Sequence, residues 1–414
     1  MQYGLIGEKL GHSFSAVIHA MLKSNPYELV ELTSDEIEAF FSKKNFCAIN
    51  VTIPYKTTVI PYLSHISKRA QAIGAVNTVV NRGGELWGYN TDFYGLCALV
   101  AHAGISLSNK KVAILGTGGT SKTVRAVAEF MGADEILLVS RRSGEGVVTY
   151  ADLYEHHTDV EVIFNTTPVG MYPNSEAAPV DVSAFQKLEG VIDTIYNPLC
   201  TKLVLDAKNC GIKAEGGLYM LVAQAVRASE LFLDCTYDDG TTERIYQTLL
   251  GQTQNLVLSG MPASGKSTVG KLLAKELNRP FFDLDEEIVR VAGRTIPEIF
   301  ATDGEVAFRD LETRVLRELF ANQKGIVLAT GGGAVLRDEN VDFLRRNGKI
   351  YFIDRPLEDL MPTSDRPLAS SREAICRRYE ERYERYCQTA DCHIDGKGSV
   401  EEVAARIRKD FETL

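Results

Sequence analysis

The sequence predicts an α/β fold divided into two units. Two glycine-rich turns predict this arrangement, at residues 110–121 and 255–268. Each turn follows a short apolar strand and leads into an amphipathic helix, which is the local order of a βαβ unit. Strand-like and helix-like stretches alternate over the rest of the chain, as in an α/β layer. The 414 residues also exceed one ordinary core of roughly 100–200 residues.

Composition and charge point to a soluble chain that acts on small molecules. Apolar residues make up 45% and charged residues 24% of the chain, as in globular proteins. The net charge of −10 disfavours nucleic acid and anionic membrane as partners, because both demand a basic face. No run of about eighteen apolar residues predicts a membrane span. The eight cysteines form no C-x-x-C pair and the first residues lack a signal-peptide pattern, so we expect a reduced, cytoplasmic protein.

The first unit is predicted to contain two domains. Residues 1–105 form an α/β layer, with strands at 3–6, 48–53 and 76–80 and helices at 15–22 and 35–41. The rest follows the first glycine-rich turn, with a helix at 122–131, strands at 135–140, 160–165 and 190–194, and helices at 217–233 and 238–250. We therefore expect a substrate domain at 1–105, to which the helices of 217–250 return, and a dinucleotide domain at 106–250. A polar linker at 251–255 leads to the second unit at 256–414.

The first glycine-rich turn matches most of the dinucleotide fingerprint G-x-G-x-x-G. Gly116 and Gly118 stand at its first two positions, and Ser121 stands where the third glycine is usual. A strand, a helix and a second strand surround it in the correct order. We therefore expect a Rossmann-type domain.

The end of the second strand indicates which dinucleotide binds. NAD sites usually place Asp or Glu about 20 residues past the glycines, whereas this sequence has Ser140, Arg141 and Arg142 there. A carboxylate would repel a 2′-phosphate, and guanidinium groups pair with it. We therefore expect NADP(H) rather than NAD. The alternative is that the two arginines are solvated surface residues.

The second glycine-rich turn reads G-x-x-x-x-G-K-S, with Gly260, Gly265, Lys266 and Ser267 at the fixed positions. Glycine lets the backbone approach phosphates, the lysine supplies charge, and the serine can ligate magnesium. The turn therefore predicts a P-loop that binds a nucleoside triphosphate.

Residues 281–288 read as a second strand of this unit, ending in Asp283 and Asp285. On a strand, side chains at i and i+2 face the same way. One carboxylate can then help to hold magnesium while the other takes the proton of an acceptor hydroxyl. Another buried strand, at 326–333, ends in three glycines that offer backbone N–H groups to an anion.

Seven motifs of the first unit resemble the successive motifs of shikimate dehydrogenases. They are G-H-S-F-S (11–15), N-V-T-I-P-Y-K (50–56), G-A-V-N-T (74–78), Y-N-T-D (89–92), N-T-T-P-V-G-M (165–171), D-T-I-Y-N-P (193–198) and G-L-Y-M-L-V-A-Q (217–224). The resemblance implies that Lys56 and Asp92 catalyse reduction of a ring ketone. It implies that the substrate contacts Asp92 together with Ser13, Ser15, Thr52, Asn77, Tyr196 and Gln224. It places the cofactor against Gly116, Thr117, Gly118, Gly119, Thr120, Ser140, Arg141, Arg142, Thr194 and Gly217. Ser13 and Ser15 could instead cap the following helix, and Ala16 departs from a common proline.

The second unit resembles shikimate kinases over about residues 255–395. The resemblance implies that Lys266, Asp285 and Arg366 are catalytic, with Asp285 as the base and Arg366 in a lid. It implies magnesium at Ser267 and Asp283, and ATP against Gly260, Ala263, Ser264, Gly265, Lys266, Ser267 and Thr268. Shikimate would contact Asp285, Arg309, Gly331, Gly332, Gly333 and Arg382.

The remaining arginines of 372–385 are predicted to lie on an exposed helix, with the ion pairs Glu373/Arg377 and Glu381/Arg385. Ala263 replaces a common glycine, the lid at 360–366 is short, and an adenine-packing arginine near 361–363 is absent. These departures bear on nucleotide affinity or base preference, and catalysis should survive them.

These features predict a substrate domain and a Rossmann-type NADP domain followed by a P-loop domain of the nucleoside monophosphate kinase type. The expected function is NADPH-dependent reduction of 3-dehydroshikimate, then ATP- and Mg²⁺-dependent phosphorylation of shikimate. One alternative is a dehydrogenase whose second unit only senses nucleotide. Another is quinate or a related hydroxy acid as substrate. Both a monomer and a homodimer are compatible with the sequence.

Overall fold

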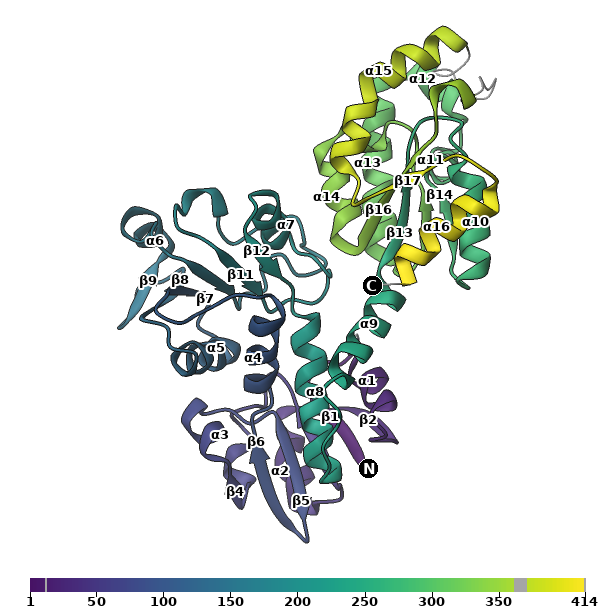
Figure 1. Ribbon diagram of the computed structural model, residues 1–414. Coiled ribbons are helices and arrows are strands. Elements are labelled where there is room, and N and C mark those ends of the chain that lie inside the picture. Colours follow the sequence, from purple (N-terminus) through teal and green to yellow (C-terminus); the bar gives the residue numbers. More distant parts are fainter. Residues whose placement is uncertain (12, 361–370, 413–414) are drawn as a thin grey trace. The chain divides into compact units, whose positions relative to one another are not determined.

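The computed structural model describes residues 1–11, 13–360 and 371–412. They form two compact units, Met1–Tyr246 and Gln247–Leu414 (Figure 1). Among the described residues, no helix is long and apolar enough to cross a membrane.

A six-stranded mixed sheet forms the first half of unit 1. Its order is β2-β1-β3-β5-β6-β4, with β1 (Tyr3–Gly7), β2 (Tyr27–Glu31), β3 (Ala48–Val51), β4 (His65–Ile66), β5 (Thr78–Arg82) and β6 (Glu85–Tyr89). β1 pairs in parallel with β2 and β3, and β5 is antiparallel to β3 and β6. Neighbouring residues of β3 face opposite sides: Ile49 packs with Phe41 of α2 (Ile37–Lys43), and Ala48 packs with Phe232 of α8 (Leu218–Leu233).

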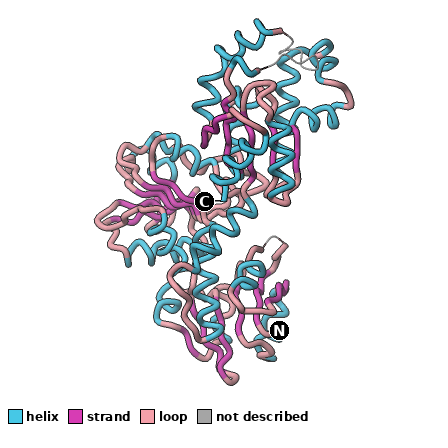
Figure 2. The backbone as a smooth tube through the Cα atoms, turned by 45° about the vertical axis from the view of Figure 1, so that its right-hand side comes forward, coloured by secondary structure: helices cyan, strands magenta, loops and turns pink. Residues whose placement is uncertain are grey.

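A fully parallel sheet forms the second half of unit 1. Its order is β12-β11-β10-β7-β8-β9, with β7 (Lys111–Leu115), β8 (Glu135–Ser140), β9 (Val147–Thr149), β10 (Val162–Asn165), β11 (Gly190–Asp193) and β12 (Lys213–Glu215). The order reverses between β7 and β10, as in doubly wound folds that bind dinucleotides at the carboxyl ends of their strands. Val112 and Ile114 belong to one core and Ala113 and Leu115 to another, so helices cover both faces (Figure 2).

The remaining helices of unit 1 connect these strands. They are α1 (Ser15–Met21), α3 (Lys68–Ile73), α4 (Asp92–His102), α5 (Gly119–Phe130), α6 (Tyr150–His156) and α7 (Lys202–Asn209). α8 follows the parallel sheet in sequence but packs against α4 and against β3 and β5 of the mixed sheet. α8 therefore returns to the domain that begins the chain.

Unit 2 is built on a five-stranded parallel sheet with the order β14-β15-β13-β16-β17. Its strands are β13 (Asn255–Ser259), β14 (Phe281–Asp283), β15 (Val327–Ala329), β16 (Gly348–Asp354) and β17 (Cys392–Asp395). Its helices are α10 (Lys266–Glu276), α11 (Leu284–Ala292), α12 (Ile296–Thr302), α13 (Gly304–Asn322), α14 (Asp338–Asn347), α15 (Arg372–Thr389) and α16 (Val400–Glu412). Val257 packs beneath α11 and α13, whereas Leu256 and Leu258 pack beneath α10 and α16. Two helical layers therefore enclose the sheet.

Two local predictions need correction. The polar stretch 251–255 is not an irregular linker, because α9 (Thr241–Thr253) continues through Gly251 and β13 begins at Asn255. The strand expected over 281–288 ends at Asp283, and α11 begins at the next residue. Asp283 caps that helix by accepting a hydrogen bond from the Asp285 amide (3.0 Å), which explains why the strand stops there.

Candidate active sites

The predicted catalytic pair of unit 1 is in direct contact. Lys56 Nζ donates to Asp92 Oδ2 over 2.7 Å. Lys56 lies in the segment after β3, where its carbonyl oxygen accepts a hydrogen bond from the Val76 amide (2.8 Å), and Asp92 is the first residue of α4. The two side chains are 22% and 13% exposed. A small molecule can therefore reach the pair, although most of its surface is packed.

A buried polar network holds Asn77 and Gln224 close to this pair. The Asn77 amide group is hydrogen-bonded to Thr91, since Oδ1 accepts from the Thr91 amide (2.7 Å) and Nδ2 donates to Thr91 Oγ1 (3.0 Å). The Thr91 hydroxyl also reaches Gln224 Oε1 (3.4 Å) on α8. Because Thr91 directly precedes Asp92, one residue orients an expected substrate contact and the carboxylate that is predicted to be catalytic.

The network continues through side chains to which the sequence assigned no role. Asn50 Nδ2 donates to Thr78 Oγ1 (3.1 Å), and the Tyr27 hydroxyl donates to Asn50 Oδ1 (2.8 Å). Burial raises the pKa of Tyr27, although a hydrogen bond with Ser15 opposes the increase. Asn50 and Thr91 both belong to the recognised motifs, which was the only signal that could have identified them.

The other expected substrate contacts lie near the start of α1 and after β3 and β11. Ser13 Oγ accepts from the Ser15 amide (3.1 Å), so Ser13 does satisfy an amide of the first helical turn. The Tyr196 ring meets the Phe14 ring edge-on at 6.1 Å, and burial raises the pKa of Tyr196. Among the described residues, neither Thr52 nor Tyr196 hydrogen-bonds to Lys56 or Asp92.

The dinucleotide loop leaves open space above the start of α5. Gly116 has φ +106°, and a Cβ there would lie 2.8 Å from Thr166 Oγ1, so only glycine fits. A Cβ at Gly118 or Gly119 would meet no atom within 4 Å. Thr117 and Thr120 lie in the same turn, and the Ser121 hydroxyl closes it by donating to the Gly118 carbonyl oxygen (2.6 Å). The first amides of α5 have no side-chain cap, which suits binding of a pyrophosphate.

The two arginines expected to select NADP follow β8 directly. Arg141 and Arg142 are exposed, and among the described residues neither forms an ion pair with a carboxylate. The Ser140 hydroxyl accepts from the Arg142 amide (3.5 Å). Two unpaired guanidinium groups at this strand end fit the 2′-phosphate of NADP.

Thr194 and Gly217 close the carboxyl end of the same sheet. Thr194 Oγ1 donates to the Asn165 carbonyl oxygen (3.0 Å), and a Cβ at Gly217 would collide with the Thr194 carbonyl oxygen. Asp193 is buried beneath them and accepts from Thr201 Oγ1 (2.6 Å), Asn165 Nδ2 (3.1 Å) and the Ile195 amide (3.0 Å). Burial raises the pKa of Asp193 to about 6.

The P-loop of unit 2 lies between β13 and α10. Lys266 is buried, and its ammonium donates to the carbonyl oxygens of Gly260 (2.9 Å) and Met261 (2.8 Å). Ala263 has φ +65°, so the alanine that replaces a common glycine adopts a left-handed conformation that costs roughly 1 kcal/mol. Ser264 and Gly265 end the loop, and Thr268 lies exposed in the first turn of α10.

The expected magnesium ligands are in contact. Ser267 Oγ donates to Asp283 Oδ2 over 2.5 Å, and Asp283 is 8% exposed. A hydroxyl and a carboxylate beside the P-loop are ligands that suit Mg²⁺. The residues present therefore fit the ion.

The residues predicted to contact the phosphate acceptor gather around the turn of Gly331, Gly332 and Gly333. A Cβ at Gly331 would lie 2.7 Å from Asp285 Oδ1, and one at Gly333 would collide with the Arg309 guanidinium. Arg382 Nη1 donates to the Gly332 carbonyl oxygen (3.0 Å). Asp285 thus reaches the site from the first turn of α11, and not from a strand face as predicted.

A buried carboxylate that the sequence reading missed completes this cluster. Glu312 is inaccessible to solvent, and its Oε2 accepts from Arg309 Nη1 (2.8 Å). Burial raises the pKa of Glu312, with the Arg309 charge opposing and the Asp285 charge adding to the shift. Glu312 lies three residues after Arg309 on α13, and that helical spacing was the only available signal.

Two further predictions concern arginines of the lid and of α15. Arg366 lies outside the described residues, as do Met361, Pro362 and Thr363. Arg385 does not pair with Glu381, because its Nε donates to the Val335 carbonyl oxygen (2.7 Å) and its Nη2 pairs with Asp338 (2.5 Å). Arg382 is buried, unlike an ordinary residue of an exposed helix.

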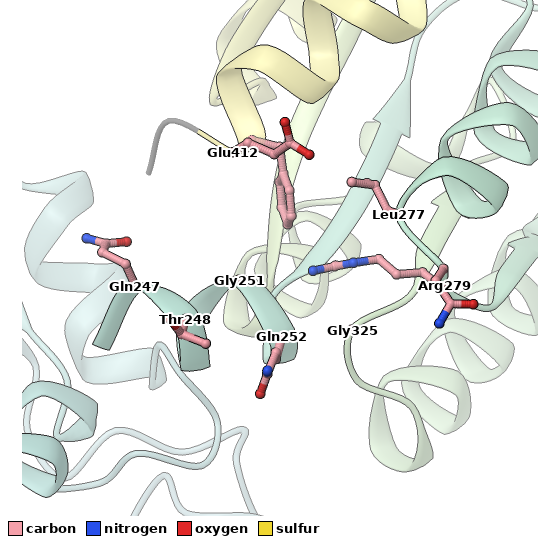
Figure 3. Close-up of a pocket in the computed structure, with 10 residues that line it drawn as sticks. Gln247, Thr248, Gly251, Gln252, Leu277, Arg279, Gly325 and Glu412 are labelled. Atoms are coloured by element: carbon pink, nitrogen blue, oxygen red, sulfur yellow. The ribbon is translucent and has the colours of Figure 1, made fainter. Parts of the chain in front are cut away.

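A pocket of about 540 Å³ lies elsewhere in unit 2. Gln252 enters it from α9, and Leu277 and Arg279 enter from the end of α10 (Figure 3). Arg279 Nη1 donates to the Gln254 carbonyl oxygen (2.7 Å), and its guanidinium lies 4.6 Å from the centre of the Phe411 ring. None of the predicted site residues lines this pocket.

The fold and the two sites define a dinucleotide-dependent oxidoreductase joined to a P-loop phosphotransferase. Residues 5–79 match the family model of the shikimate dehydrogenase substrate binding domain, and residues 262–412 match that of shikimate kinase. A shikimate dehydrogenase (NADP(+)) of Clostridium perfringens (strain SM101 / Type A) is 37% identical over 265 residues, which cover 60% of this chain and 97% of that protein. The chain therefore belongs to the shikimate dehydrogenase family and carries a shikimate kinase domain in the same polypeptide.

Solved structures agree with this assignment. Shikimate dehydrogenase 1 from Peptoclostridium difficile is 36% identical with a TM-score of 0.55, covering 60% of this chain and 98% of that one. A chorismate mutase/shikimate 5-dehydrogenase fusion protein from Clostridium acetobutylicum is 35% identical with a TM-score of 0.56, covering 60% and 96%. The two family resemblances drawn from the sequence are confirmed.

Proposed function

We propose that the chain catalyses two consecutive reactions. Unit 1 reduces 3-dehydroshikimate to shikimate with NADPH, and unit 2 phosphorylates shikimate with ATP and Mg²⁺. The main support is that one polypeptide carries both domains and that the product of the first reaction is the acceptor of the second. We assign residues 1–105 with the returning helices of 217–250 to the substrate domain, 106–250 to the NADP domain and 256–414 to the kinase domain.

In unit 1, Lys56 and Asp92 perform the proton transfer. NADPH, when bound, supplies the hydride. The Lys56 ammonium donates a hydrogen bond and then its proton to the ketone oxygen, and Asp92 stabilises the charged form of Lys56 from 2.7 Å away. The hydroxyl and amide groups of Ser13, Ser15, Thr52, Asn77, Tyr196 and Gln224 orient the polyhydroxylated ring.

In unit 2, Asp285 accepts the proton of the attacking hydroxyl, and Arg309 and Arg382 hold the substrate carboxylate. Both arginines already have protein partners, Glu312 for Arg309 and the Gly332 carbonyl oxygen for Arg382. Each guanidinium has five N–H donors, so donors remain for the acid. Ser267 and Asp283 would hold Mg²⁺, which would neutralise charge on the phosphates when bound. Lys266 and, in the lid, Arg366 stabilise the transferring group.

A direct assay tests the whole proposal. The purified chain is given 3-dehydroshikimate, NADPH, ATP and Mg²⁺, and the loss of NADPH and the release of ADP are followed together. We expect that NADPH is consumed even when ATP is left out. We expect that ADP is released from added shikimate even when NADPH is left out. The complete mixture should show both changes. NADPH loss with no ADP release from either substrate would favour the alternative in which unit 2 only senses nucleotide.

Quinate is the second candidate substrate for unit 1. A quinate dehydrogenase from Corynebacterium glutamicum in complex with NAD is 26% identical with a TM-score of 0.53, covering 60% of this chain and 98% of that one. The exposed Arg141 and Arg142 favour NADP over the NAD that this quinate dehydrogenase binds. Parallel assays with shikimate and NADP, and with quinate and NAD, compare the two substrates directly.

We expect the protein to act on small molecules in the cytoplasm, without nucleic acid or membrane partners. We expect it to be a monomer or a homodimer.

A further inference from the structure

Arg355 lies at the same edge of the sheet as the P-loop. β16 pairs in parallel with β13, with Phe352 opposite Ser259. Both strands end within a few residues of this pair, so Gly260 and Arg355 follow neighbouring strand ends. A Cβ at Gly260 would lie only 2.9 Å from the Ile353 carbonyl oxygen, which shows how closely the loop and the strand end pack.

The backbone of Arg355 is fixed by the turn after β17. A Cβ at Gly396 would lie 2.9 Å from the Asp354 carbonyl oxygen and 3.0 Å from the Arg355 nitrogen. Gly396 itself donates to the Asp354 carbonyl oxygen (2.9 Å). The Arg355 side chain extends from this fixed backbone to the end of the P-loop. There its Nη1 lies 3.8 Å from the position that a Cβ atom would occupy at Gly265.

The guanidinium of Arg355 has no protein acceptor among the described residues. Its Nε is buried and makes no hydrogen bond, and no described carboxylate forms an ion pair with it. The adjacent Asp354 is already engaged, since its Oδ2 accepts from the Tyr383 hydroxyl (2.9 Å). A partly buried cation without a partner is unfavourable, and an anion arriving at this position relieves that cost.

We infer that Arg355 binds the phosphate chain of the nucleotide at the P-loop, as a second cation beside Lys266. The inference rests on the proposed kinase function of unit 2. Lys266 is held by the carbonyl oxygens of Gly260 and Met261, so it approaches the phosphates from within the loop. Arg355 approaches from the strand end, over Gly265, where backbone amides and the start of α10 already favour an anion. The sequence motif does not include this residue.

Arg355→Gln tests the inference, with Arg408→Gln as its matched control. Arg408 is an exposed arginine of the same unit, and it pairs with Glu276 (3.1 Å) on the outside of α10. Calorimetric titration of the full-length chain with MgADP measures nucleotide affinity without phosphoryl transfer. We expect Arg355→Gln to weaken MgADP by at least about tenfold, the effect of one lost charge-assisted hydrogen bond. Arg408→Gln and the NADPH-dependent activity of both variants should be unchanged.

Inorganic tripolyphosphate identifies the part of the nucleotide that Arg355 contacts. The affinity of tripolyphosphate is measured by its displacement of MgADP. In Arg355→Gln this affinity should fall by the same factor as the affinity for MgADP, because tripolyphosphate has phosphates but no base or ribose. An unchanged MgADP affinity overturns the inference, and so does a weakened MgADP affinity with unchanged tripolyphosphate binding. A wild-type chain that binds MgADP but does not phosphorylate shikimate would contradict the proposed function and leave this test intact.

Discussion

The Lys56 ammonium and the Asp92 carboxylate meet at 2.7 Å although 36 positions separate them in the chain. Two backbone contacts bring them together. The carbonyl oxygen of Lys56 accepts from the Val76 amide (2.8 Å), and the side chain of the next residue, Asn77, accepts from the Thr91 amide (2.7 Å). Thr91 then leads directly into Asp92 at the start of α4. Three segments of the mixed-sheet domain thus fix one ion pair.

Lys56→Ala should lower the turnover of 3-dehydroshikimate reduction by about 10²- to 10⁴-fold, the usual contribution of a general acid. The variant should fold, because Lys56 is partly exposed and Asp92 remains in reach of solvent. NADPH absorbance measures the rate, and the fluorescence of Trp87, the single tryptophan, reports folding of unit 1. Lys68→Ala, an exposed lysine of α3, should be as active as wild type. Turnover of Lys56→Ala near that of Lys68→Ala would contradict the assigned role.

Replacing both Arg141 and Arg142 with alanine should raise the KM for NADPH by at least about 100-fold, since two charge-assisted bonds are lost and each is worth roughly 1.5–3 kcal/mol. The KM for NADH should not rise, because NADH lacks the 2′-phosphate. Both arginines are exposed, so stability should not change. Arg125→Ala removes another exposed arginine, paired with Glu129 on α5, and serves as the control. An equal loss of affinity for the two cofactors would argue against phosphate recognition by these residues.

Asp283 has two functions that separate by substitution. It caps α11 through Oδ1 and accepts from Ser267 through Oδ2. Asp283→Asn keeps a capping oxygen but removes the charge, so we expect near-normal stability and an ADP release that no longer responds to physiological Mg²⁺. Asp283→Ala should show the same loss of activity. Its free energy of unfolding should also fall by about 1 kcal/mol, because the substitution removes the side chain that caps α11. Wild-type Mg²⁺ dependence in Asp283→Asn would remove this carboxylate from the metal site.

The sequence could predict the strands that form apolar runs and the positions of residues that belong to a motif. Lys266 and Ser267 occupy the positions that the P-loop pattern assigns, and β8, β10 and β11 lie where apolar runs predicted strands. Asp285 does lie beside the Gly331 turn, but not on the strand that was predicted for it. The strand argument failed because the Asp283 carboxylate caps a helix at that point, and capping depends on side-chain geometry that hydrophobic pattern does not encode.

Residues whose position depends only on tertiary contacts could not be identified from the sequence. Glu312 is recognisable only once α13 places it against Arg309 and beneath Gly331. Arg355 follows an ordinary buried strand, and its position over Gly265 comes from strand pairing between β13 and β16. The substrate contacts predicted for unit 1 came from the family motifs alone, because side-chain contacts between Asn77, Thr91 and Gln224 join segments far apart in sequence.

Asp193 should make the stability of unit 1 depend on pH. Burial raises its pKa from 3.8 to about 6 in the folded chain. Between these values the folded chain keeps a proton that the unfolded chain has released, so the unfolding free energy from this group is highest below about pH 4 and falls as pH rises towards 6. The change should be about 3 kcal/mol, because the shift of 6 − 3.8 = 2.2 pKa units corresponds to 1.36 kcal/mol per unit. Asp193→Asn removes the titration. Urea unfolding followed by Trp87 fluorescence, at about pH 4 and about pH 7, should therefore give a smaller loss of stability between the two pH values in the variant than in wild type. Parallel losses in the two proteins would show that Asp193 titrates normally, and its three acceptor contacts with Thr201, Asn165 and Ile195 would then be strong enough to hold the carboxylate charged in the core.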